Sequence, residues 1–240
     1  MIAAKILFYL AIMHVLPPSF PQVMTGGPAG GGGSISVIQG QVAESGSATT
    51  TITATISTGN AVFCAINNYG STAISCSDDT SDTFTPVNAL FTGTGIDAGT
   101  SETFRACTPT AGARTFTATT NGTGELVATI MEIHSLATCA ADQVNHTDIS
   151  SATATPTTGS ITTTHAASII LGWYSTNNTP GAFTAVSPWS FTVGTGSLTQ
   201  TGSGFASALV YQIVSSTGTY NPAVDVNTAS LAVGQTVNLY

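Results

Sequence analysis

The sequence predicts an all-β protein: an antiparallel two-sheet sandwich of the jelly-roll type, preceded by a short apolar N-terminal helix and a Gly-rich tether. Beyond residue 34, short apolar and β-branched runs alternate with turn residues about every ten positions, the spacing of a sandwich. No segment there has a helical period. Only 6% of the 240 residues are charged and 42% are hydrophobic, so the chain has enough apolar surface to fold.

The charge balance argues against a nucleic acid partner. The formal net charge is −8, and one of the three basic residues, Lys5, lies in the N-terminal segment. The rest of the chain holds Arg105 and Arg114 against eleven acidic residues, so it has no basic stripe to follow a phosphate backbone. Hydroxyl and amide side chains are expected to hydrate the surface without ion pairs, which suits the outside of a cell or of a virus particle.

Residues 1–24 are the expected N-terminal anchor. Pro17 and Pro18 end its apolar run, which has helix-forming length. A signal peptide would place Lys5 before such a run, but no small-residue cleavage site follows at the usual distance. A transmembrane span needs about 20 apolar residues, more than the run offers. We expect it to dock into a neighbouring subunit, with a signal or membrane anchor as the alternative. The docking residues are Ile6, Leu7, Phe8, Leu10, Ile12, Met13 and Leu16.

Residues 25–34, TGGPAGGGGS, are the expected tether, because a glycine-rich run buries too little side chain to order itself. The body then spans 35–240. At 49–56, Ile52, Ala54 and Ile56 share one face while the threonines point away, an alternation of period two. The runs 60–66 and 126–134 are almost continuously apolar and are expected in the centre of a sheet. The other expected strands are 35–43, 83–87, 102–107, 113–120, 160–164, 168–175, 189–193, 205–214, 219–227 and 230–240, with a looser stretch at 144–158.

The inward faces of these strands predict the core, in which each large apolar side chain contributes about 1.5–3 kcal/mol. About a dozen strands favour two stacked sheets of the jelly-roll type. The expected core residues are Phe63, Ile66, Phe116, Ile130, Ile133, Ile170, Trp173, Leu209 and Val210.

Two stretches of the body resemble a known class of module. They are SISVIQGQVAESGSATTTITATISTGNAVFCAIN, followed by the turn SCSDDTSDTFTPV, and GSITTTHAASIILGWYSTNNTPGAFT. Both resemble Thr/Ser/Gly-rich, concanavalin-like jelly-roll sandwich modules of phage structural and fibre proteins and of bacterial surface proteins. The resemblance covers about residues 34–240 and is one of pattern, without a catalytic signature. It implies a fold and a setting rather than an activity.

The four cysteines fit either free thiols or two disulfides. Cys64 and Cys76 each lie six residues from Gly70 in a turn-rich run, so a hairpin there would bring them within disulfide range. Cys107 and Cys139 would then form the second bridge. Because no C-x-x-C pair is present, zinc is not expected.

Two groups of polar residues are candidates for chemistry. Glu132 and His134 lie two apart on an expected strand, so they share a face and could do acid–base work or hold half a metal site. With no third group, an exposed polar strand face is the plainer interpretation. Asp78, Asp79 and Asp82 crowd one turn, which makes calcium a candidate ligand, although aspartate also forms turns through its own backbone.

Tyr174 is the candidate platform for a sugar ring. Trp173 and Tyr174 are adjacent on an expected strand, so they point to opposite faces, and we assign Tyr174 to the outer one. Sequons at Asn121, Asn145 and Asn177 matter only if the host glycosylates its proteins.

No catalytic motif is present, and the four histidines are scattered, so we expect no catalytic residues and no cofactor besides the candidate calcium. The expected function is that of a non-catalytic structural subunit on a virion surface or outside the cell. It would be a phage head decoration or fibre protein, or an extracellular filament subunit, held to neighbouring copies or to a capsid or filament protein by its apolar peptide. The alternative is a secreted carbohydrate-binding adhesin that binds surface glycan. A glycan hydrolase using Glu132 is a third hypothesis.

Overall fold

The computed structural model describes residues 34–94, 99–122, 124–176, 178, 181–193, 196–197, 199–201 and 206–240. All regular structure in these residues is β-strand, and every strand pairing is antiparallel, which confirms the fold class at that level. The expected anchor at 1–24, its helix, and the tether at 25–34 apart from Ser34 lie outside the described residues.

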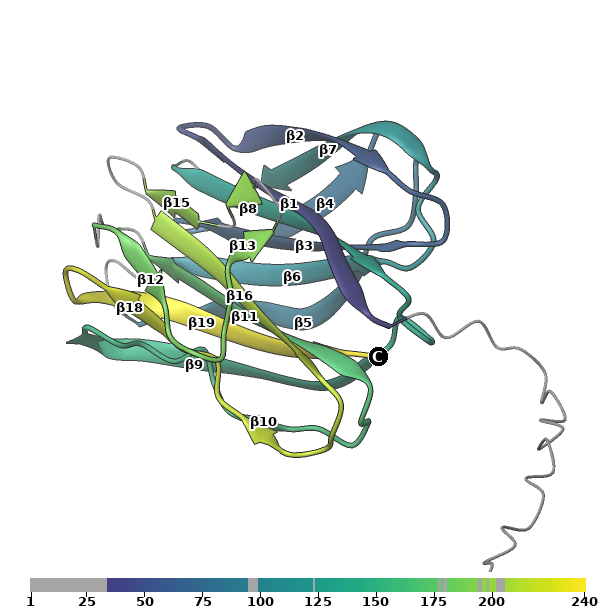
Figure 1. Cartoon of the computed structure of the whole chain (residues 1–240). Helices are drawn as coiled ribbons and strands as arrows, with labels where there is room; N and C mark the ends of the chain where they lie inside the picture. Colours follow the sequence, from purple (N-terminus) through teal and green to yellow (C-terminus); the bar gives the residue numbers. More distant parts are fainter. Residues whose placement is uncertain are drawn as a thin grey trace, which may run out of the picture. The chain divides into compact units, whose positions relative to one another are not determined.

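The N-terminal half of the body forms a five-stranded and a three-stranded sheet (Figure 1). The five-stranded sheet, sheet A, has the order β1 (Ser36–Ser45), β8 (Leu126–His134), β3 (Ala61–Asn68), β6 (Thr100–Ala106) and β5 (Thr85–Thr92). The three-stranded sheet, sheet B, has the order β2 (Thr49–Ile56), β7 (Gly112–Thr120) and β4 (Ile74–Asp78).

The C-terminal half repeats this arrangement. Its five-stranded sheet, sheet C, has the order β9 (Ala141–Thr153), β19 (Ser230–Leu239), β11 (Ser168–Thr176), β16 (Ala206–Val214) and β15 (Thr199–Thr201). Ranked along the chain, the strands of sheets A and C follow the same order. The short pairs β10 (Ile161–Thr162) with β17 (Thr219–Tyr220), and β12 (Phe183–Ala185) with β18 (Val224–Val226), take the chain positions of sheet B. A small ladder joins β13 (Thr192–Val193) to β14 (Gly196–Ser197).

The register of the two edge strands supports the repeat. The ladder of β1 with β8 passes from Val37 to Gln39, and the ladder of β9 with β19 passes from Ala141 to Gln143. Near its first residues, each edge strand therefore carries one extra residue, as in a β-bulge. The ladder of β9 with β19 has a second irregularity between Ser230 and Ala232. The body consists of two consecutive halves with one topology, so the expectation of a single two-sheet sandwich was too simple.

The core lies in three apolar clusters between the layers. One lies between sheets B and A and includes Ile66 and Phe116. The second joins the other face of sheet A to sheet C and includes Phe63 and Trp173. The third lies between the far face of sheet C and the short strand pairs, and Ile170 belongs to it. All nine expected core residues are buried, as predicted. Because sheets A and C are covered on both faces, β3, β8 and β11 are apolar almost throughout.

Gly172 on β11 lies close to Thr158 and Pro222 of the outer layer. A Cβ atom added there would overlap Pro222 and lie 2.7 Å from Oγ1 of Thr158. We therefore expect Gly172→Ala to lower the free energy of unfolding by about 1–3 kcal/mol through overpacking, measured by urea denaturation. Gly46→Ala is the control, because no atom lies within 4 Å of that Cβ position. Equal stability of the two variants would contradict the close packing of this layer.

Candidate functional site

Two hollows in the N-terminal half share the turn that follows β4. The first, called the groove, has a volume of about 610 Å³ and is lined by Gln39 and Gln41 of β1, threonines of β2 and β7, Asp79 and Arg114. The second, called the cleft, has a volume of about 400 Å³ and lies between the turn residues Ser81 and Asp82 and the end of β6 at Arg105. Both volumes fall within the range of small-molecule sites, about 300–1,000 Å³.

A buried carboxylate lies next to the groove. Glu132 on β8 is 1% exposed. Its Oε1 accepts hydrogen bonds from the Ser57 backbone N–H (2.7 Å) and from Nδ2 of Asn60 (2.6 Å). Its Oε2 accepts one from Nε2 of Gln39 (2.6 Å). Nδ1 of the exposed His134 lies 2.7 Å from Oδ1 of Asn60.

This network corrects the interpretation of Glu132 and His134 as an exposed polar face. Only His134 is exposed, and Asn60 joins the two side chains. Because both oxygens of Glu132 already accept hydrogen bonds, the carboxylate is fixed in place. It joins β1 and the β2–β3 connection to β8, so the role that these contacts support is to stabilise the fold.

The acidic turn after β4, which contains Asp78, Asp79 and Asp82, is held by hydrogen bonds of its own carboxylates. Oδ1 of Asp78 accepts hydrogen bonds from the backbone N–H groups of Thr80 (3.2 Å) and Asp82 (3.0 Å). Asp82 accepts hydrogen bonds from the backbone N–H (2.6 Å) and the hydroxyl (3.0 Å) of Thr110. Burial alone would raise the pKa of Asp82, but hydrogen bonds, those from Thr110 first and then those with Asp78 and Thr80, together outweigh it and leave this pKa below its ordinary value.

The hydrogen bonds of this turn bear on the calcium prediction for Asp78, Asp79 and Asp82. Two of the three carboxylates shape the turn, and Asp79 lines the groove. In the part of the chain that the structure describes, no group of three His, Cys, Asp or Glu side chains is placed to hold a metal ion. Asp78 and Asp82 therefore act as turn formers, and calcium binding at this turn stays a prediction.

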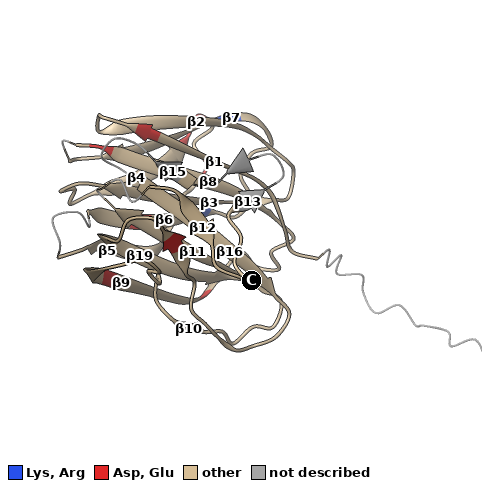
Figure 2. Ribbon diagram, turned by 60° about the vertical axis from the view of Figure 1, so that its left-hand side comes forward, with Lys and Arg blue, Asp and Glu red and all other residues tan. Residues whose placement is uncertain are grey.

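Charged residues are sparse on the body, as the few blue and red ribbon segments of Figure 2 show. Its two arginines differ in their hydrogen bonds. The Arg114 guanidinium donates to the main-chain carbonyls of Thr110 (2.8 Å), Ala113 (2.7 Å) and Ala111. Among the described residues, nothing accepts a hydrogen bond from Nε of Arg105, although that atom is buried. All three nitrogens of the Arg114 guanidinium are therefore bound within its own loop, whereas Nε of Arg105 has no partner among the described residues.

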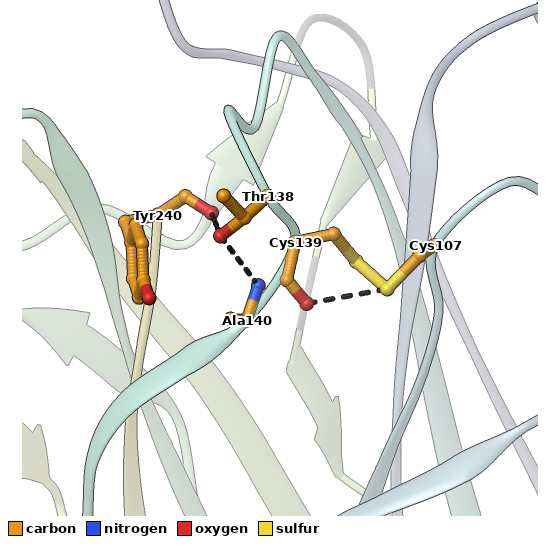
Figure 3. The surroundings of a disulfide bond; sticks show 5 residues. All are labelled: Cys107, Thr138, Cys139, Ala140 and Tyr240. Carbon is orange, nitrogen blue, oxygen red and sulfur yellow. Dashed lines mark hydrogen bonds between the residues drawn. A yellow bond between two sulfur atoms is a disulfide. The ribbon is translucent and has the colours of Figure 1, made fainter.

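The two disulfides pair as expected, Cys64 with Cys76 and Cys107 with Cys139. The hairpin that would have brought Cys64 and Cys76 together does not form, because β3 and β4 belong to different sheets. Cys64 lies on β3 of sheet A and Cys76 on β4 of sheet B, with their Cα atoms 6.8 Å apart, so the bridge joins two layers. The second bridge joins residues just after β6 to the segment between the halves (Figure 3). Two disulfides fit an extracellular or otherwise oxidising environment.

The prediction of Tyr174 as a sugar platform was wrong. Tyr174 is fully buried, packs edge-on against Phe183 at 5.7 Å between ring centroids, and shares a hydrogen bond with Oγ of Ser230 (3.0 Å). Trp173 and Tyr174 do point to opposite faces of sheet C, since they belong to different clusters. The short strands of the C-terminal half cover the face on which Tyr174 lies, so neither ring reaches the surface.

Burial raises the pKa of Tyr174 to about 12, and the hydrogen bond with Ser230 offsets only part of this shift. The unfolded phenol, with its ordinary pKa of 10.0, ionises first, so stability should be complete below pH 10 and be lost as pH rises toward 12. We expect Tyr174→Phe to lose about 1 kcal/mol near neutral pH and to flatten this alkaline decline. Urea unfolding of both proteins at neutral pH and near pH 11 checks this. Parallel declines would show that Tyr174 is not the group responsible.

Comparisons with protein families, curated proteins and solved structures found no match to this chain. Within the described residues, no helix has the length and apolar character needed to cross a membrane. The predicted docking residues between Ile6 and Leu16 lie outside those residues.

Proposed function

We propose that this protein is a non-catalytic structural subunit displayed on the surface of an extracellular assembly or a virion. The observation that supports the proposal most is that several of its few charged side chains form hydrogen bonds within the fold. Glu132, Arg114 and Asp82 all hold strands or turns together through hydrogen bonds. A body of stacked sheets with two disulfides and little surface charge suits a role in which rigidity and durability are selected.

The repeated topology supports the same proposal. In each half, five longer strands form one sheet and the intervening strands form a second, smaller layer, which we interpret as a jelly roll. Sheets A and C pack face to face through a continuous apolar cluster. Two such units in tandem make a thick, rigid block, the kind of module that a particle or filament presents outward.

In the proposed arrangement, the apolar residues at 1–24 dock into a neighbouring subunit and the segment 25–34 separates that contact from the body. The body could then project from the assembly without sharing its packing.

Deletion of residues 1–24 tests the proposal. In sedimentation velocity, we expect the full chain to form assemblies and the deletion variant to be monomeric with an unchanged melting temperature. Leu7→Glu with Leu10→Glu in the full chain should act like the deletion, whereas Gly31→Ser in the tether should not. A full chain that stays monomeric but binds lipid vesicles would overturn the docking role and favour a membrane anchor.

A further inference from the structure

Arg105, one of the two arginines of the body, lines the cleft. On sheet A, β6 places Arg105 opposite Phe63 of β3 on one side and Thr85 of β5 on the other. The cleft is bordered by Ser81 and Asp82 of the acidic turn and, past Arg105, by Thr108. The Cys107–Cys139 disulfide fixes this end of β6 to the segment between the halves.

The Nε atom of Arg105 is buried and has no hydrogen-bond partner among the described residues, and a buried donor in this state is costly. Arg114 differs in this respect, because three main-chain carbonyls accept hydrogen bonds from its guanidinium. Arginine stays charged at any physiological pH, and the planar carboxylate is an acceptor that its fork matches with two parallel hydrogen bonds.

The rest of the cleft restricts the ligand further. Asp82 lines the same cleft but, within the described part of the chain, makes no ion pair with Arg105. A small inorganic anion could pair with Arg105, but it would leave the hydroxyl groups of the cleft wall without a partner. The remaining wall includes the hydroxyl residues Ser81, Thr83, Thr85 and Thr108. A ligand with one carboxylate and several hydroxyl groups can use both kinds of partner.

We propose that the cleft binds the acidic unit of a glycan, a carboxylate-bearing sugar such as a uronic or sialic acid, with its carboxylate on Arg105. The cleft volume of about 400 Å³ suits one such unit. This site is separate from the buried Tyr174, and it does not depend on residues 1–24. It would give a displayed subunit a way to attach to an acidic surface glycan.

Ligand-observed NMR and calorimetry on the full chain test the proposal, with glucuronic acid and N-acetylneuraminic acid as probes and glucose and sulfate as comparisons. We expect the acidic sugars to bind at least about tenfold more tightly than glucose or sulfate. Arg105→Gln should weaken acidic sugar binding at least about tenfold, and Arg105→Lys should weaken it less, because lysine keeps the charge and loses the fork.

Two control variants make the result specific. Lys5→Gln removes the same charge from the N-terminal segment, and Gln41→Ala alters the groove but not the cleft. Neither should change the affinity for acidic sugars, and an unchanged melting temperature of Arg105→Gln will show that this variant folds. The proposal is overturned if neither acidic sugar binds, if sulfate binds as tightly as they do, or if Gln41→Ala weakens binding while Arg105→Gln does not.

Discussion

Replacing Glu132 by alanine is expected to lower the free energy of unfolding by about 3–5 kcal/mol, one of the two largest effects anticipated for this protein. The substitution removes the acceptor of the Ser57 backbone N–H and of Nδ2 of Asn60. It also removes one of the two acceptors of Nε2 of Gln39, which keeps the Thr55 carbonyl. An orphaned buried donor costs about 1–3 kcal/mol, and water that enters from the nearby groove would recover part of the loss. Urea denaturation followed by circular dichroism measures the change.

Two further variants separate the network from the loss of volume. Glu132→Gln keeps the shape and one acceptor oxygen but turns an amide group toward other donors, so we expect an intermediate loss. His134→Ala removes only the outermost member, which is exposed and joined through Asn60, and should cost less than about 1 kcal/mol. If Glu132→Ala were as stable as His134→Ala, the carboxylate would not be the centre of the network.

Much of the fold could be predicted from local patterns. The alternation at β2 places Ile52, Ala54 and Ile56 in the core and their threonine neighbours outside, as the structure shows. The continuous apolar runs of β3 and β8 predicted central strands, because only a strand covered on both faces buries successive residues. These features depend on neighbouring residues alone.

Features that depend on distant partners could not be predicted. The stretch 144–158 was expected to be loose, yet most of it belongs to β9, an edge strand whose mixed exposure gives no clear alternation. Glu132 is buried because its three partners arrive from positions 72 to 93 residues away. Tyr174 is covered by strands of two or three residues, which are too short to have a period.

In the candidate site, too, some features could be predicted from the sequence and others depend on distant contacts. The pairing of the cysteines followed from their number and spacing, but the layers that each bridge joins follow from the topology. Arg105 and Arg114 are equivalent in the sequence as the body's two cations. Only the contacts of the folded chain separate the arginine bound to three carbonyls from the one whose Nε is unpaired.

Removal of the Cys107–Cys139 disulfide, as Cys107→Ser with Cys139→Ser, is expected to cost about 3–4 kcal/mol. The bridge closes a loop with a sequence separation of 32 that contains β7 and β8, and chain-entropy arguments give the larger stabilisation to the longer loop. Beside the bridge, the Thr138 hydroxyl donates to Tyr240 O (3.3 Å), a hydrogen bond drawn in Figure 3. The flanking segment holds the C-terminal residue through the hydrogen bonds from Thr138 N to Tyr240 O (3.2 Å) and from Tyr240 N to Ala140 O (3.2 Å).

The other disulfide provides the matched control. Cys64 and Cys76 are separated by 12 positions, so the same entropy argument predicts that Cys64→Ser with Cys76→Ser costs about 1 kcal/mol less than the first pair of substitutions. Urea denaturation of both variants and of the parent, under oxidising conditions and with a reductant, measures the order directly. The entropy account fails if loss of the shorter loop destabilises the protein more. It would then be the link between sheets A and B, rather than the length of chain enclosed, that sets the contribution of each bridge.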